Sequence, residues 1–154
     1  MAHIVWTPDL DTQIEVIDRQ HRRIVDYINA LDDAIEAGDR AQVAQVLDQL
    51  VDYTLSHFAF EESLMEDAGY RFVNAHRRVH EVFTKRVADY QRRFAAGEEI
   101  AAELQKTLQT WLINHIRNDD NDYAADVRKK MGKTAAKPDA GWLKTRLRQF
   151  FSRG

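Results

Sequence analysis

Six side chains that can ligate a metal ion lie in long segments of this chain with helical periodicity. They are His21, His57, Glu61, His76, His80 and His115. Two pairs, His57 with Glu61 and His76 with His80, have a spacing of four residues, which places both members on one side of a helix. All six fall among apolar residues that a helix would bury, where an unpartnered imidazole or carboxylate is costly. A metal ion would compensate that cost, and the alternative is a network of hydrogen bonds between buried polar groups.

A seventh candidate ligand follows from the register of the last long segment. Continued from His115 by threes and fours, the apolar stripe runs into a polar face, whereas Asp120, Tyr123 and Val127 form a second stripe one residue out of register. One extra residue in a helix makes a π turn, and such turns occur mostly at functional sites. The sequence therefore predicts a π turn that brings Asp120 to the side of His115. On simple spacing, Asp119 is the alternative ligand.

The number and type of these donors indicate a dinuclear site. Five imidazoles and two carboxylates are more than one metal ion needs, so we expect two ions bridged by the carboxylates. The chain has no cysteine, which excludes thiolate-bound zinc, iron–sulfur clusters and disulfides. Nitrogen and oxygen donors suit iron, with manganese and zinc as alternatives on ligand type alone.

Four helices must position these side chains. Apolar residues at spacings of three and four predict helices over residues 13–37, 40–66, 70–95 and 98–131. Each ends beside a glycine, which can cap a helix C-terminus: Gly38, Gly69, Gly97 and Gly132. Loops this short connect antiparallel neighbours, so the expected fold is all-α, an up-down-up-down four-helix bundle with an N-terminal arm.

The motifs resemble those of the hemerythrin family, and specifically its single-domain bacteriohemerythrins. The family pattern is a lone His followed by H-x3-E, H-x3-H and H-x4-D. It is matched here by His21, His57–Glu61, His76–His80 and His115–Asp120. The family's tyrosine three residues after the aspartate is matched by Tyr123, which favours Asp120 over Asp119. The resemblance covers about residues 1–131.

The resemblance implies a non-haem pair of iron ions (Fe2+/Fe3+) with an oxo or hydroxo bridge. One iron would be held by His76, His80 and His115. The other would be held by His21 and His57 and would keep an open position for dioxygen, with Glu61 and Asp120 as bridges. The implied function is reversible dioxygen binding, for oxygen storage, delivery or scavenging.

Apolar residues next to the ligands in sequence are expected to form an oxygen pocket around the open iron. They are Ile24, Phe58, Trp111 and Leu112. Such residues would keep water away from bound oxygen. The alternative is that they are core residues with no further role.

Two other functions use the same kind of centre. Catalytic di-iron bundles are rich in carboxylates, whereas five imidazoles and two carboxylates occur here, so we favour a carrier over an oxidase, oxygenase or peroxidase-type enzyme. A sensor of oxygen or redox state would have to act through a partner, because residues outside the bundle leave no room for an output domain.

A basic extension follows the bundle, over residues 132–154. Six Lys and Arg against one Asp within residues 133–154 give it a net charge of +5, whereas the whole chain carries −3, which leaves −8 for the rest. Residues 142–153 have an amphipathic helical pattern. Two alternatives remain open: a helix that binds a membrane surface or a protein partner, and a helix that folds back on the acidic bundle.

Composition also limits location and partners. No secretory signal and no apolar run of about 20 residues is apparent, so we expect a cytoplasmic protein, with the basic helix as a means of attachment to the inner membrane surface. Nucleic acid is not an expected partner, because the bundle is acidic and the basic segment is short.

Overall fold

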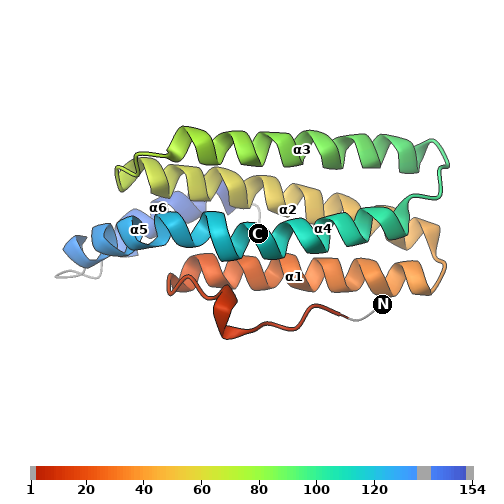
Figure 1. The fold of residues 1–154 in the computed structure, drawn as a ribbon, viewed down its shortest axis with the longest axis horizontal. Coiled ribbons are helices and arrows are strands. Elements are labelled where there is room, and N and C mark those ends of the chain that lie inside the picture. The colour runs from red at the N-terminus through yellow and green to blue at the C-terminus, as the bar shows by residue number, and fades with distance from the viewer. Residues whose placement is uncertain (1–2, 135–139, 152–154) are drawn as a thin grey trace.

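The computed structural model describes residues 3–134 and 140–151, and among these it contains helices and no strand (Figure 1). The long elements are, in order, α1 (Glu15–Glu36), α2 (Arg40–Asp67), α3 (Val73–Ala95) and α4 (Ala101–His115). A π-helical turn, η2 (Ile116–Asp120), joins α4 to α5 (Asn121–Thr134). A short 3-10 helix, η1 (Pro8–Leu10), precedes them, and α6 (Ala140–Phe151) follows.

Four rods lie side by side in Figure 1: α1, α2, α3 and the continuous run from α4 to α5. Successive rods are joined by short turns at opposite ends, so each is antiparallel to the one before it. The predicted all-α, up-down-up-down bundle is therefore confirmed.

The turn between α1 and α2 shows how local sequence ends one helix and begins the next. Gly38 has a φ of 68°, a left-handed conformation that residues with a Cβ rarely adopt. Asp39 then caps α2, because its carboxylate accepts a hydrogen bond from the backbone N–H of Gln42 at 3.1 Å. Gly69 and Gly97 also have positive φ values after α2 and α3.

The prediction that Gly132 ends the fourth helix was wrong. Gly132 does not stop the helix, since α5 continues through it to Thr134. Glycine costs only about 1 kcal/mol in a helix interior, so it does not end a helix by itself. The other predicted boundaries lie within about three residues of those observed.

Two apolar clusters form the core, and the candidate ligands lie between them along the chain. The larger cluster includes Ile24 and Leu112. The smaller one surrounds Phe60 and Tyr123. On α1, for example, His21 stands between Ile17 of the smaller cluster and Ile24 of the larger one. The polar residues of the bundle are thus enclosed by apolar packing on both sides.

The helix α6 is docked on the bundle. Leu147, Phe150 and Phe151 pack against the smaller cluster. The Phe151 ring centroid lies 5.4 Å from that of Tyr53 and 5.8 Å from that of Phe60, both on α2. Of the two alternatives for the amphipathic segment, the structure shows the one in which it folds back on the bundle. Among the described helices, none is both long and apolar enough to cross a bilayer.

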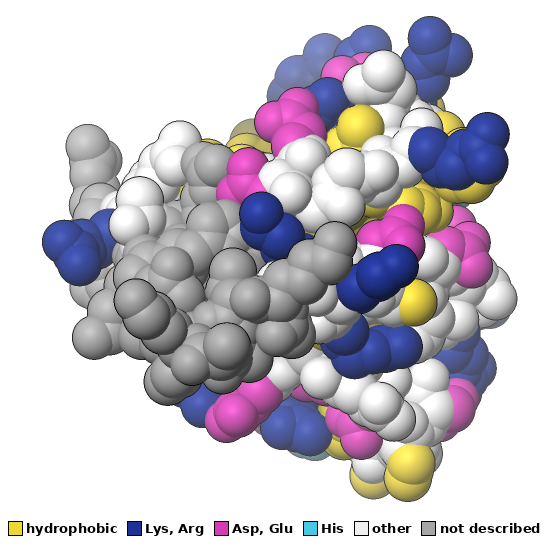
Figure 2. Space-filling view, turned by 90° about the vertical axis from the view of Figure 1, so that its left-hand side faces the viewer, with side chains coloured by type: hydrophobic (Ala, Val, Ile, Leu, Met, Phe, Trp, Pro, Cys, Tyr) yellow, Lys and Arg dark blue, Asp and Glu magenta, His cyan; other side chains and the backbone are white. Residues whose placement is uncertain are grey.

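Figure 2 shows the end of the bundle that lies on the left in Figure 1. On the part of this end that the structure describes, basic and acidic side chains are interspersed. Cross-helix ion pairs contribute to such mixing: Arg77 of α3 pairs with Glu62 and Glu66 of α2. These pairs hold α3 against α2 beside one of the candidate ligand pairs.

Candidate metal centre

The structure brings all seven predicted ligand residues into one buried cluster. His21 comes from α1, His57 and Glu61 from α2, His76 and His80 from α3, His115 from the end of α4, and Asp120 from the π turn. Each is at most 5% exposed. Their ligand atoms form two groups that share the two carboxylates, and within each group the atoms lie within 4.8 Å of one another.

The two oxygens of Glu61 face different histidines. Oε1 lies 3.2 Å from Nε2 of His80 and 3.7 Å from Nε2 of His76. Oε2 lies 3.4 Å from Nε2 of His57 and 3.5 Å from Nε2 of His21. A carboxylate in this orientation can bind one metal ion through each oxygen.

The two oxygens of Asp120 also face different histidines. Oδ1 lies 3.1 Å from Nε2 of His115 and 3.2 Å from Nε2 of His76, whereas Oδ2 lies 3.0 Å from Nε2 of His21. Three histidines therefore surround one end of the carboxylate pair and two surround the other.

The π turn decides which aspartate enters the cluster. The helix widens over Ile116–Asp120, as the shift of register predicted, and Asp120 is fully buried. Asp119 points outward, with 41% of its side chain exposed, and accepts a hydrogen bond from Nδ1 of His115 at 2.8 Å. The two neighbouring carboxylates thus have different positions: one within the cluster and one behind its histidine.

Two further residues orient histidines, and the sequence reasoning missed both. Nδ1 of His57 lies 2.6 Å from Oε1 of Gln20, and Nδ1 of His80 lies 3.0 Å from Oε2 of Glu62. An acceptor at Nδ1 fixes the ring and leaves Nε2 free to bind a metal ion. Gln20 and Glu62 are the chain neighbours of two ligands, and a search for polar residues next to the ligands would have found them.

Tyr123 holds Glu61 from the other side. Its hydroxyl donates a hydrogen bond to Oε2 of Glu61 at 2.8 Å, and both side chains are fully buried. Burial and the nearby carboxylates raise the pKa of Tyr123 well above its ordinary value. The hydroxyl therefore keeps its proton and remains a donor.

Several buried atoms of the cluster lack a hydrogen bond, which tests whether metal ions fit. They are both ring nitrogens of His21, Nε2 of His76, Oε1 of Glu61 and both carboxylate oxygens of Asp120. Buried polar atoms are nearly always paired, because desolvation without a partner is costly. All but Nδ1 of His21 are atoms that face the shared centre. The donor set therefore fits a pair of metal ions.

The charges in the cluster also favour bound metal ions. Burial lowers the pKa of His21 and His76, but Asp120 and Glu61 outweigh it and raise each to about 9. Burial also opposes the charge of His115, yet Asp120 and Asp119 raise its pKa to about 10. The carboxyl pKa of Asp120 is lowered despite burial, because these histidines stabilise the anion. Without metal the cluster therefore holds protons, which metal ions would displace.

The four predicted pocket residues lie around the cluster. Ile24, Phe58 and Leu112 are at most 4% exposed, and Trp111 is partly buried. The Phe58 ring stacks on His80 with centroids 3.8 Å apart, and the Trp111 ring stacks on His115 at 4.4 Å. The aromatic rings thus cover the end of the cluster that has three histidines.

Comparison with known proteins agrees with this site. A family model described as the hemerythrin HHE cation binding domain matches residues 12–127. The chain belongs to the hemerythrin family. Hemerythrin domains bind a di-iron centre and are in general dioxygen-binding proteins, and the buried His, Glu and Asp cluster of this hemerythrin is suited to that centre.

Similar proteins include bacteriohemerythrins from several organisms and a hemerythrin of known structure. A bacteriohemerythrin of Pseudomonas aeruginosa is 53% identical over 152 residues, which cover 98% of this chain and 99% of that protein. A bacteriohemerythrin of Methylococcus capsulatus is 36% identical over 125 residues, covering 80% of this chain and 95% of that protein. A crystal structure of wild-type hemerythrin has a TM-score of 0.78 and 34% identity, covering 82% of this chain and 98% of that one.

Proposed function

We propose that this hemerythrin binds dioxygen reversibly at a di-iron centre, for oxygen storage, delivery or scavenging, and that it is not an enzyme. The observation that carries the proposal is the unequal division of the cluster. Two shared carboxylates face three histidines at one end and two at the other, so the second end offers one protein ligand fewer.

The ligand assignment follows from the carboxylate oxygens. We propose that His76, His80 and His115 hold one iron, together with Oε1 of Glu61 and Oδ1 of Asp120. The other iron would be held by His21 and His57, together with Oε2 of Glu61 and Oδ2 of Asp120. The residues on α1 and α2 thereby leave a position for dioxygen.

When bound, the iron pair supplies the electrons and the open coordination position that dioxygen requires. The chain supplies the surroundings. Ile24 and Leu112, both buried in the larger apolar cluster, would line the oxygen pocket, whereas Phe58 and Trp111 stack on His80 and His115 and exclude water from the end with three histidines. Tyr123 keeps Glu61 in its bridging orientation through its hydrogen bond.

The balance of donors favours a carrier over an enzyme. Carboxylate-rich di-iron sites, in which four glutamates accompany two histidines, support oxidation chemistry. Five imidazoles and two carboxylates supply less negative charge, so high-valent iron is stabilised less. Relatives of this chain carry the names bacteriohemerythrin and myohemerythrin.

We propose a cytoplasmic location and a division into a di-iron bundle over residues 1–131 and an accessory extension over 132–154. The family model supports this division, since its match ends at residue 127. Attachment of residues 142–153 to a membrane or a protein partner would require the apolar side of α6 to leave α2.

Oxygen titration of anaerobically reduced protein tests the function. We expect about two irons per chain and a visible spectrum that appears with oxygen and disappears when oxygen is removed, over repeated cycles. His57→Ala should lose this behaviour, whereas His3→Ala, which changes a half-exposed histidine outside the cluster, should retain it. Protein that contains zinc in place of iron, or that consumes oxygen at each cycle, would contradict the proposal.

A further inference from the structure

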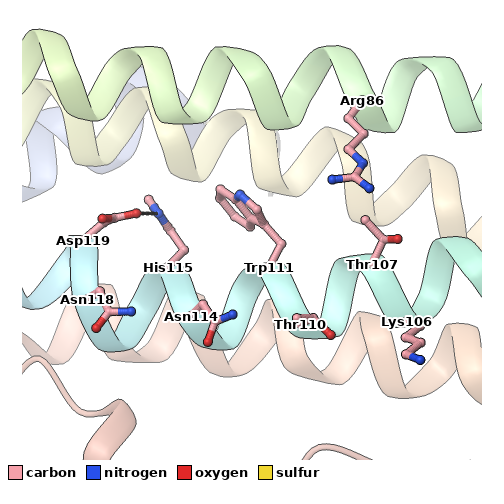
Figure 3. A pocket seen from close by; sticks show the side chains of 9 residues that line it. All are labelled: Arg86, Lys106, Thr107, Thr110, Trp111, Asn114, His115, Asn118 and Asp119. Carbon is pink, nitrogen blue, oxygen red and sulfur yellow. Dashed lines mark hydrogen bonds and ion pairs between the residues drawn. The ribbon is translucent and has the colours of Figure 1, made fainter.

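A polar groove runs along the surface between α3 and α4 and reaches the metal centre. Its volume is about 460 Å³, within the range of small-molecule sites. Its floor includes Thr107, Trp111 and His115, which recur every four residues and so share one side of α4, and Asp119 of η2 continues this row. Figure 3 shows this row, with Arg86 of α3 extending toward it from the opposite wall.

His115 connects the groove to the centre. It lines the groove, and its Nε2 lies 3.2 Å from Nε2 of His80 and 3.1 Å from Oδ1 of Asp120. Trp111 stacks on the same ring, and Asp119 accepts a hydrogen bond from its Nδ1. A molecule in the groove would therefore be separated from the centre by one imidazole ring.

The other end of the groove is positively charged. Arg86 and Lys106 line it, and neither forms an ion pair or hydrogen bond with a residue that the structure describes. Asp119 is the one acidic residue in the lining, and it is bonded to His115 near the opposite end (Figure 3). The uncompensated charges attract an anionic group to the end far from the centre.

The length and lining of the groove specify the shape of its ligand. Lys106 and His115 are nine positions apart on α4, which corresponds to about 14 Å along the helix. Between them the lining offers the hydroxyl of Thr110 and the amide of Asn114. The fitting molecule is elongated and has a phosphate or carboxylate at one end and hydroxyl groups in the middle. Its far end lies beside His115 and the edge of Trp111, whose two faces are covered by Phe83 and His115.

We propose that this groove binds a reduced flavin nucleotide and is the site where electrons return to the centre after it has been oxidised to the diferric state. The dihydroflavin would give up two electrons, one for each of the two ferric ions, and two protons, which pass to water. The groove places the phosphate at Arg86 and Lys106 and the ring beside His115. This proposal rests on the proposed di-iron function.

Charge reversal in the groove tests the proposal. Arg86→Glu with Lys106→Glu should slow reduction of the diferric protein by reduced flavin mononucleotide about tenfold or more, because reversed charges repel the phosphate. The matched control is Lys85→Glu with Lys129→Glu, which changes the net charge equally at exposed positions outside the groove lining and should keep the original rate. Reduced riboflavin has the same ring but no phosphate, and its rate should be nearly equal in all three proteins.

A binding measurement separates this proposal from the function of the centre. Oxidised flavin mononucleotide should bind the metal-free protein, as followed by flavin fluorescence, and the groove double variant should weaken that binding while the control does not. The groove variant should also keep two irons and its oxygen spectrum. Equal flavin binding and equal reduction rates in the two double variants would overturn the electron-transfer site. Loss of iron or of oxygen binding by the unmodified protein would instead refute the proposed function.

Discussion

Exchange for asparagine should affect the metal centre far more at Asp120 than at its neighbour Asp119. Asp120 is fully buried, and its two oxygens lie 3.0 to 3.2 Å from Nε2 atoms of three histidines. Asp119 is partly exposed, and its one contact with a ligand histidine is the hydrogen bond from Nδ1 of His115. Asp120→Asn therefore removes a charged donor from both metal positions, whereas Asp119→Asn keeps an oxygen that can accept the hydrogen bond of His115.

The positions of the two side chains decide the expected size of each effect. Asp120→Asn should reduce the iron content from about two per chain to one or none. Loss of a group that orients a ligand typically lowers metal affinity by about 10- to 100-fold, or about 1.4 to 2.7 kcal/mol, so Asp119→Asn should keep two irons with an affinity lowered by no more than this. In the metal-free protein, removing one member of a buried charged group costs about 3–5 kcal/mol. For Asp120→Asn we expect a loss of stability at the lower end of this range, because the histidines can release their protons and so lose the positive charge that Asp120 balanced.

Anaerobic iron titration with chemical iron determination measures the first effect, and urea unfolding of metal-free protein measures the second. Circular dichroism establishes that both variants are folded before metal is added. An Asp119→Asn protein without iron beside an Asp120→Asn protein with two irons would refute both the assignment of the bridge and the role of the π turn.

Three further predictions concern the charge, the hydrogen bonds and the packing around the centre. In the metal-free protein, three histidines have a pKa of about 9 to 10 instead of 6.5. Their contribution to the free energy of unfolding is therefore complete below pH 6.5 and is lost as the pH rises through 9 to 10. Urea unfolding at a series of pH values should show this decline in metal-free protein and not in iron-loaded protein. Tyr123→Phe leaves a buried oxygen of Glu61 without its donor and should cost about 1.5–3 kcal/mol in urea unfolding of the metal-free protein; an unchanged stability would show that the hydrogen bond contributes nothing. Phe151→Ala removes a half-buried ring that packs on Tyr53. It should lower the free energy of unfolding by about 1–2 kcal/mol, less than the roughly 3–5 kcal/mol expected for a fully buried phenylalanine. A stability equal to that of the unmodified protein would place α6 away from the bundle.

The periodicity of the sequence was sufficient to predict the fold and the position of the ligands within it. Polar residues in otherwise apolar stripes, such as His21 between Ile17 and Ile24, can only face the core if their helix forms. The π turn was also predictable, since His115 and Asp120 belong to stripes that are one residue out of register. These features depend on spacing along one helix, which the sequence contains directly.

Features that depend on side-chain conformation or on the choice of a partner surface could not be predicted in this way. The contacts of Gln20 and Glu62 with histidine nitrogens require particular rotamers across a helix interface. The amphipathic pattern of α6 indicates an apolar side but not the surface that covers it, and Phe151 packs on the bundle. Gly132 permits a helix end without enforcing one.

We expect the buried cluster to hold two iron ions that share both carboxylates. Anomalous difference density from crystals of iron-loaded protein, recorded at the iron absorption edge, would locate these ions. We expect two peaks per chain, one beside His76, His80 and His115 and one beside His21 and His57, with the two carboxylates between them. A single peak, or iron bound outside this cluster, would contradict it.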